Sequence, residues 1–137
     1  MKAVFDTNVL VSALFWRGTP HHCFLAAQAG LFELIVSDEI LNELRRVLSQ
    51  KLRLPPEEVE EAVKSILAIA QRVDITETVM RVREDPADDK FLSVAASAKG
   101  DFVVSGDKHL LRIGEFRKIR IISTSNFFVQ VLGEWIH

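Results

Sequence analysis

Acidic residues stand directly after two apolar runs of the sequence, where strands that turn into helices often carry chemistry. Asp6 ends the run Ala-Val-Phe, and Asp107 follows the run Phe-Val-Val after Ser105 and Gly106. A glycine there permits a tight turn and a close backbone approach. Each aspartate also has a purely structural explanation, because Asp is a good N-cap and an anion suits a helix N-terminus. Either residue alone leaves catalysis and capping both open.

Two further acids lie beside apolar helix faces. Glu43 flanks the apolar stripe of a predicted helix over Asp38–Gln50, where partial burial of its carboxylate would call for a partner. Asp88 stands three, four and seven residues before apolar side chains of the next helix, so it points along the inward face. Asp89 lies about 100° away, toward the outside. The alternatives are a boundary glutamate in water and another helix cap.

Taken together, the four acids predict a metal site. Carboxylates gathered at one point repel one another and titrate as a coupled set. No buried basic residue stands at an obvious position to neutralise them, and a divalent cation would do so. Oxygen-only ligands suit Mg²⁺ or Mn²⁺ rather than Zn²⁺. The cluster His21-His22-Cys23 lacks a second ligand pair, so we expect no zinc site there.

Strand and helix patterns alternate along the chain, which predicts a parallel sheet with crossover helices. Short β-branched runs indicate strands at Ala3–Asp6, Glu33–Val36, Asp101–Ser105 and Arg120–Ser123. Apolar periodicity and capping residues indicate helices at Val9–Phe15, Pro20–Ala29, Asp38–Gln50, Pro55–Gln71, Asp88–Ala98, Lys108–Arg112 and Phe127–Ile136. Ligand sites in such sheets form beyond the carboxyl ends of the strands, where Asp6 and Asp107 fall.

Size and composition limit the classes of protein. The 137 residues, 48% hydrophobic and 26% charged, fit one soluble domain over 1–137, without a membrane-spanning run or a recognisable signal peptide. The single cysteine excludes an intrachain disulfide and fits a reducing cytoplasm. A net charge of −2 is not that of a general polyanion binder. A nucleic-acid ligand would therefore need local groups of arginine and lysine, which the sequence contains.

Four stretches of the sequence, in this order, resemble the PIN domain family, and within it the toxin components of prokaryotic toxin–antitoxin systems akin to the VapC toxins. They are VFDTNVLVSALF, SDEILNELRRVL, DPADDKFLSVAASAKGDFVVSGDKHLL and IISTSNFF, and together they run over nearly the whole chain. The resemblance implies a Rossmann-like three-layer α/β/α sandwich around a central, mostly parallel sheet. It also implies metal-dependent cleavage of RNA, usually single-stranded.

The resemblance assigns roles to individual residues. Asn8 and Ser105 match polar positions that support the site, and a one-residue shift of the preceding loop would exchange Asp88 for Asp89. One or two Mg²⁺ or Mn²⁺ ions would bind the scissile phosphate, activate a water molecule and stabilise the leaving oxygen. The four catalytic and metal-binding acids map onto Asp6, Glu43, Asp88 and Asp107.

Two other functions stay open, namely a PIN-like module that binds RNA or a protein without cutting, and a structure-specific DNA nuclease. The resemblance also implies a homodimer and a small antitoxin partner that blocks the site. Candidate contacts for the antitoxin are the apolar faces of Val9–Phe15 and Pro20–Ala29, including Phe15, Trp16 and Phe24. The other interpretation of these faces is ordinary core.

Overall fold

The computed structural model, which describes residues 1–79 and 89–133, contains a six-stranded sheet in the order β3-β2-β1-β4-β6-β5. Neighbouring strands are parallel except for the antiparallel pair of β5 and β6. The strands are β1 Lys2–Phe5, β2 Glu33–Val36, β3 Gln71–Arg72, β4 Phe102–Val104, β5 Glu115–Phe116 and β6 Ile119–Ile122. This mostly parallel sheet confirms the predicted fold class.

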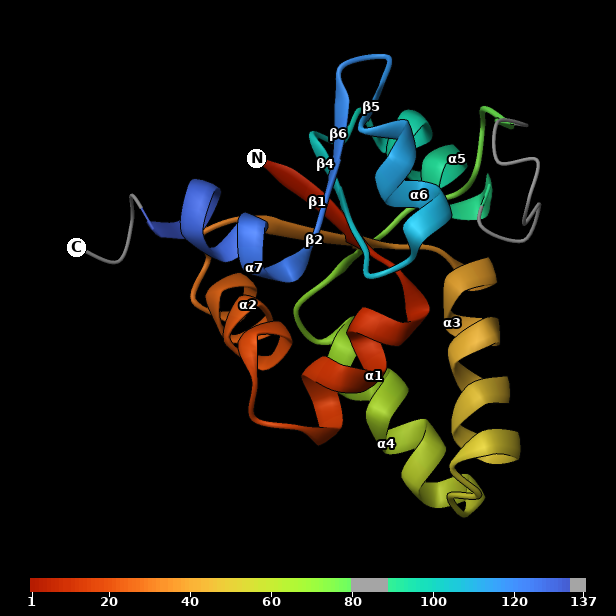
Figure 1. Cartoon of the computed structure of the whole chain (residues 1–137). Helices are drawn as coiled ribbons and strands as arrows, with labels where there is room; N and C mark the ends of the chain where they lie inside the picture. Colours follow the sequence, from red (N-terminus) through yellow and green to blue (C-terminus); the bar gives the residue numbers. More distant parts are fainter. Residues whose placement is uncertain (80–88, 134–137) are drawn as a thin grey trace.

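Helices cover both faces of the sheet and form the outer two layers. In Figure 1, α5 and α6 lie on one side of the strands, and α1, α2 and α7 lie on the other. Strands buried on both faces are expected to be apolar throughout, as β1, β2 and β4 largely are. The helices are α1 Thr7–Phe15, α2 Thr19–Gln28, α3 Asp38–Arg46, α4 Pro56–Leu67, α5 Asp89–Ala98, α6 Lys108–Ile113 and α7 Thr124–Asn126.

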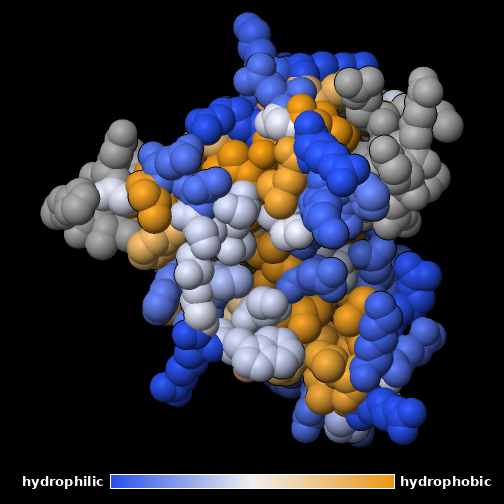
Figure 2. Space-filling model, viewed as in Figure 1, coloured by the Kyte–Doolittle hydropathy of each residue, from blue (hydrophilic) through white to orange (hydrophobic). Residues whose placement is uncertain are grey.

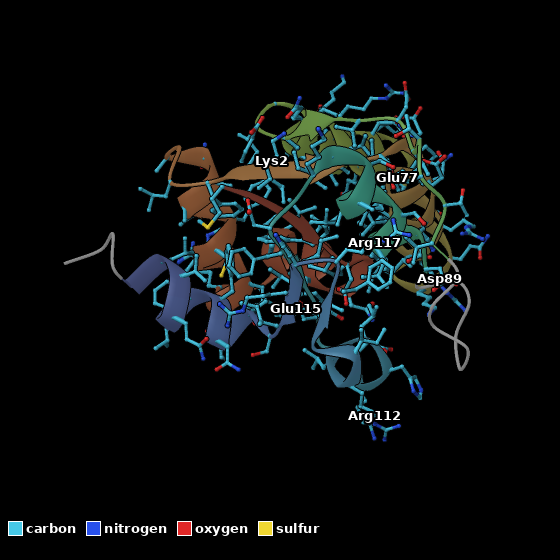
Figure 3. All side chains as sticks on the ribbon, turned by 90° about the horizontal axis from the view of Figure 1, so that it is seen from above. Lys2, Glu77, Asp89, Arg112, Glu115 and Arg117 are labelled. Atoms are coloured by element: carbon cyan, nitrogen blue, oxygen red, sulfur yellow. The ribbon has the colours of Figure 1, made fainter. Side chains whose placement is uncertain are left out.

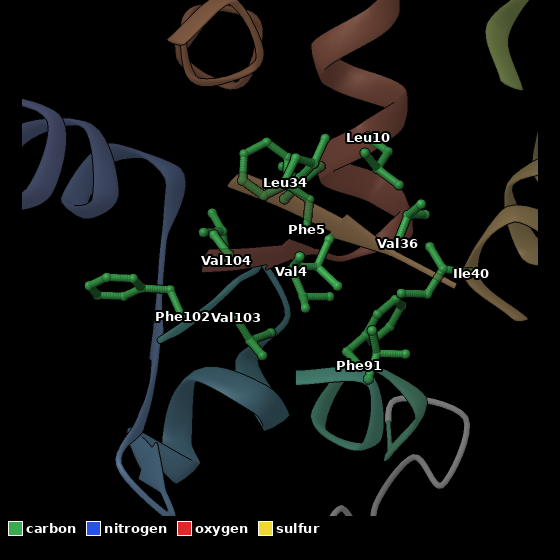
Figure 4. Close-up of a cluster of buried hydrophobic side chains, with 14 of the residues drawn as sticks. Val4, Phe5, Leu10, Leu34, Val36, Ile40, Phe91, Phe102, Val103 and Val104 are labelled. Carbon is green, nitrogen blue, oxygen red and sulfur yellow. The ribbon is translucent and has the colours of Figure 1, made fainter. Parts of the chain in front are cut away.

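Apolar side chains on the two faces of β1 hold the layers together. Figure 4 shows Leu10 of α1 and Phe91 of α5 on opposite sides of this strand. Phe127 is fully buried, and its ring centroid lies 5.0 Å from that of Phe32 and 5.5 Å from that of Phe102. Edge-on contacts of this kind between aromatic rings add to the burial of their area. The packed core fixes the strand ends from which the polar side chains project.

Three helical segments have bounds that differ from the sequence prediction. The helix predicted over Asp38–Gln50 is α-helical only to Arg46 and continues as a π-helical turn over Val47–Lys51. The helix that starts at Pro56 ends at Leu67, because Gln71 and Arg72 instead extend the sheet beside β2. The closing segment, predicted over Phe127–Ile136, begins at Thr124 as α7 and becomes a π-helix over Phe127–Leu132, and its predicted end lies outside the described residues. Every helix in the described ranges is too short or too polar to cross a lipid bilayer.

Cys23 is fully buried on α2, where its thiol faces the segment that follows β6. Its Sγ donates a hydrogen bond to the carbonyl of Thr124 at 3.8 Å. Burial raises the pKa of the Cys23 thiol to about 12. The residue therefore acts as a small core side chain and not as a reactive thiolate.

Candidate functional site

The site lies at the carboxyl ends of the neighbouring parallel strands β1 and β4. Val4 of β1 aligns with Val103 of β4, and the backbone N–H of Asp6 donates to the carbonyl of Val104 at 3.0 Å. The chain continues from β1 into α1 and from β4 into α6, which lie on opposite faces of the sheet (Figure 1). A crevice where successive connections diverge in this way is the usual ligand position in open α/β sheets.

Asp6 uses its two carboxylate oxygens for different partners. Oδ1 accepts the backbone N–H of Val9 at 2.8 Å and caps α1, whereas Oδ2 accepts the hydroxyl of Ser105. Only 5% of the residue is exposed. Burial raises the pKa of Asp6, hydrogen bonds oppose this effect, and the charge of Asp107 adds to it, so the pKa lies above its ordinary value. Asp6 thus caps α1 and also belongs to the candidate site.

Asp107 starts α6 and leaves one carboxylate oxygen available. Its Oδ1 accepts the backbone N–H groups of His109 at 2.7 Å and Leu110 at 3.1 Å. Its own N–H donates to the hydroxyl oxygen of Ser105 at 2.9 Å. Within the described residues, Oδ2 takes no hydrogen bond. Ser105 therefore links Asp6 to Asp107, and a ligand could contact the remaining oxygen of Asp107.

Glu43 lies on α3 and is held by two side chains that the sequence interpretation did not include. The hydroxyl of Thr7 donates to Oε1, and the ammonium of Lys90 donates to Oε2. Burial raises the pKa of Glu43, but the hydrogen bonds from Lys90 and Thr7 and the charges of Lys90 and Arg46 outweigh it, so the pKa lies below its ordinary value. Partly buried Lys90 thus neutralises Glu43, a pairing that the sequence did not indicate.

Thr7 and Lys90 each left a weak signal in the sequence. Thr7 follows Asp6 directly and begins the helix, so it shares the strand exit. Lys90 is a charged residue in a helix whose other positions are almost all apolar, and its ammonium lies 5.2 Å from the ring centroid of Phe91. A long aliphatic stem allows lysine to occupy such a face. The pattern alone gave no partner for the ammonium group.

The other predicted residues are Asp88, its alternative Asp89, and Asn8. Asp88 lies outside the described residues. Asp89 begins α5 and is half-buried (Figure 3). Asn8 is exposed and its side chain makes no hydrogen bond to any described residue. Within residues 1–79 and 89–133, no three acidic, histidine or cysteine residues are grouped closely enough to hold a metal ion.

The carboxylate oxygens of the described residues nevertheless suit a hard divalent cation. Asp6 and Asp107 offer only oxygen, and the charge of Asp107 contributes to the raised pKa of Asp6, so the two carboxylates repel each other. A cation near both would relieve that repulsion. Mg²⁺ is commonly bound through one or two carboxylates and completes its octahedron with water or phosphate oxygens. The residues that could hold such an ion directly are therefore Asp6 and Asp107.

Comparison with known proteins identifies the family. The profile of the PIN domain matches residues 2–109. The chain belongs to the PIN domain family. The matched range includes both strand ends of the candidate site and the residues Asp6, Glu43, Ser105 and Asp107.

A solved PIN-like structure shows the same fold. It is the crystal structure of VapBC2 from Rickettsia felis bound to a DNA fragment from their promoter, with a TM-score of 0.64 and 16% sequence identity. The likeness covers 88% of the present PIN domain chain and 97% of the other chain. No curated protein matches the sequence.

Proposed function

We propose that this PIN domain is a metal-dependent endoribonuclease that uses Mg²⁺ or Mn²⁺, and that it is the toxin of a type II toxin–antitoxin pair. The observation that carries the proposal is the Asp6–Ser105–Asp107 group at the carboxyl ends of β1 and β4. Both carboxylates lie at a strand edge where open α/β sheets place their ligands. Membership of the PIN domain family and the likeness to VapBC2 support this interpretation.

Each side chain of the site has its own role in the proposed reaction. Asp6 and Asp107 would hold the ion together with Asp88, and Glu43 would bind it directly or through water. Ser105 fixes the orientation of Asp6 and the backbone of Asp107, as groups behind metal ligands commonly do. A bound divalent ion supplies positive charge to the scissile phosphate and activates the attacking water.

Cations on both sides of the site are available to an RNA backbone. Arg46 on α3, and Lys108 and Arg112 on α6, form no ion pair with any described residue. Figure 3 shows Arg112 projecting outward from α6. Other arginines are already paired, for example Arg45 with Glu60. The unpaired groups offset the net negative charge locally and would position the phosphates of a polyanion.

The decisive experiment compares the wild type with Asp6→Asn on a panel of single-stranded RNAs and on DNAs of the same sequences. The matched control is Asp74→Asn, whose carboxylate is 78% exposed on the surface. We expect wild type and control to cut RNA with Mn²⁺ and not with EDTA, and Asp6→Asn to be inactive. Cleavage of DNA alone would favour a DNA nuclease. Binding of RNA without cleavage by the wild type would favour a binding module.

The antitoxin partner has an exposed apolar surface available. Phe15 and Trp16, at the end of α1, are 42% and 56% exposed, and Phe15 also lines a shallow groove of about 300 Å³ between α1 and α4. Figure 2 shows apolar side chains on the face that carries these helices. Phe24 is buried at 9% exposure, which for this residue favours the other interpretation, ordinary core.

The toxin role is tested in cells, separately from the chemistry. Induced expression of the wild type in the cytoplasm should arrest growth, and sequencing of RNA ends should show new cleavage positions. Asp6→Asn should do neither. Co-expression of a small protein encoded by the neighbouring gene should restore growth, and that protein should co-purify with the domain. Light scattering should show the proposed homodimer. Growth arrest that persists with Asp6→Asn would contradict toxicity by cleavage.

A further inference from the structure

Glu43 and Lys90 form an ion pair that differs from the other ion pairs of the described chain. Its two side chains are 23% and 17% exposed, whereas those of the other four pairs are between 38% and 78% exposed. The pair joins α3 to α5, two helices from distant parts of the chain. Partly enclosed charges need a partner much more than exposed ones do. Removal of either residue is therefore expected to leave the other with an uncompensated charge.

Both oxygens of Glu43 accept hydrogen bonds from neighbouring side chains. Oε1 accepts the hydroxyl of Thr7, and Oε2 accepts the ammonium of Lys90. Thr7 follows Asp6 directly, which ties this group to the proposed metal ligands. The ammonium group therefore occupies an oxygen of Glu43 that a divalent cation would use if this residue bound it directly.

The chemistry of lysine suits an exchange of partners. The other four described ion pairs all use arginine, whose planar guanidinium can bind a carboxylate in a fixed two-point geometry. Lysine offers a compact charge on a flexible stem of four carbons. Such a group can hold a carboxylate by one hydrogen bond and leave it by rotation of its own side chain, without movement of α3 or α5.

We propose that Lys90 is a positioning residue that competes with the divalent ion for Glu43. Lys90 holds this carboxylate in the metal-free protein and gives it up when the ion binds. The inference rests on the proposed function, because it takes Glu43 to be a metal ligand. By linkage, whatever strengthens the Glu43–Lys90 pair weakens metal binding, and metal binding weakens the pair by the same factor.

A double-mutant cycle on Mn²⁺ affinity, measured by titration calorimetry, tests this competition. Lys90→Met keeps the aliphatic stem and should bind Mn²⁺ about fivefold more tightly, at the low end of typical couplings between sites. In the Glu43→Gln background, Lys90→Met should change the affinity little. Arg46→Gln is the matched control, since the Arg46 charge acts on Glu43 without a hydrogen bond. Equal effects of Lys90→Met and Arg46→Gln, or equal effects of Lys90→Met in both backgrounds, would overturn the proposal.

Amine acetylation of the wild-type protein, read by mass spectrometry, gives a second measurement that needs no variant to fold. Lys90 should be protected without metal and should react faster with Mn²⁺, whereas exposed Lys64 on α4 should react at one rate throughout. Unchanged reactivity of Lys90 in protein that binds Mn²⁺ would overturn the proposal alone. Coupling of Lys90 to Mn²⁺ without any RNA cleavage would instead contradict only the proposed function. Absence of Mn²⁺ binding would overturn both.

Discussion

Ser105 donates its hydroxyl to Asp6 and accepts the backbone N–H of Asp107 at 2.9 Å. One fully buried side chain thereby joins the ends of two parallel strands, and it positions the carboxylate of Asp6 and the backbone of Asp107. The backbone N–H of Ser105 donates to the carbonyl of Ile122 at 3.0 Å, so the residue is also fixed from the neighbouring strand β6. The orientation of Asp6 and the backbone position of Asp107 are therefore built into the sheet.

Ser105→Ala should destabilise the fold and weaken Mn²⁺ binding together. The substitution removes a donor from the buried Oδ2 of Asp6, and a buried acceptor left without a partner costs about 1–3 kcal/mol. Urea denaturation measures the first effect and calorimetry the second. Ser65→Ala is the control, because the hydroxyl of Ser65 only bonds to its own helix at an exposed position. Similar losses in the two variants would contradict the role of Ser105.

Asp6→Asn should make the metal-free protein more stable at neutral pH. Burial raises the folded-state pKa of Asp6 above its ordinary value of 3.8, so the wild type loses stability as pH rises through that pKa. The asparagine side chain carries no charge and keeps an oxygen that can cap α1. A pKa shift of one unit corresponds to about 1.4 kcal/mol.

Melting curves with and without Mn²⁺ check this prediction. In EDTA at pH 7, Asp6→Asn should melt above the wild type, and the advantage should disappear in acid. Added Mn²⁺ should raise the melting temperature of the wild type and leave that of the variant unchanged. A variant that is less stable at pH 7 and still stabilised by Mn²⁺ would contradict the burial argument and the metal assignment.

Glu43→Gln should have the opposite pH dependence. The folded-state pKa of Glu43 lies below its ordinary value of 4.5, so the ionised carboxylate stabilises the fold above that pH and loses this effect as pH falls through the folded pKa. We expect the variant to be about 1 kcal/mol less stable at pH 7, with the difference shrinking in acid. Urea midpoints from pH 3 to pH 8 measure it. Glu60→Gln, in an exposed pair, should show a difference near zero throughout.

Paired substitutions decide which residue is the third acid. Asp88→Asn should weaken Mn²⁺ binding strongly, and Asp89→Asn should change it little, because the spacing directs Asp88 to the inward face of the helix. Calorimetric titration of both variants with Mn²⁺ gives the answer directly. A larger loss for Asp89→Asn would show that the preceding loop is shifted by one residue relative to the assignment.

The central strands were predictable because their burial on both faces demands an unbroken apolar run. Glu33–Val36 is predicted with its observed ends, and β1 and β4 are found within one residue at each end. The edge strands β3 and β5 were missed, since each has two residues and at least one exposed polar side chain. Their pairing is decided by the neighbouring strand and not by their own sequence.

The candidate site was predictable only in part for a similar reason. Strand exits can be located from apolar runs, and these placed Asp6 next to Asp107. The partner of Glu43 could not be located from the sequence. Lys90 lies on another helix, 47 positions further along the chain than Glu43. Helical periodicity gives the face on which a residue lies but not which residue of another helix will face it.

The burial of Cys23 gives the molecule an internal reporter of unfolding. The protein has one cysteine, its side chain is inaccessible in the native fold, and its thiol stays protonated at neutral pH. A thiol-alkylating reagent should therefore modify only those molecules in which α2 has separated from the sheet. The labelling rate would measure how often this happens under native conditions, and a change upon addition of Mn²⁺ would show whether an ion at the far ends of β1 and β4 restrains the opposite layer.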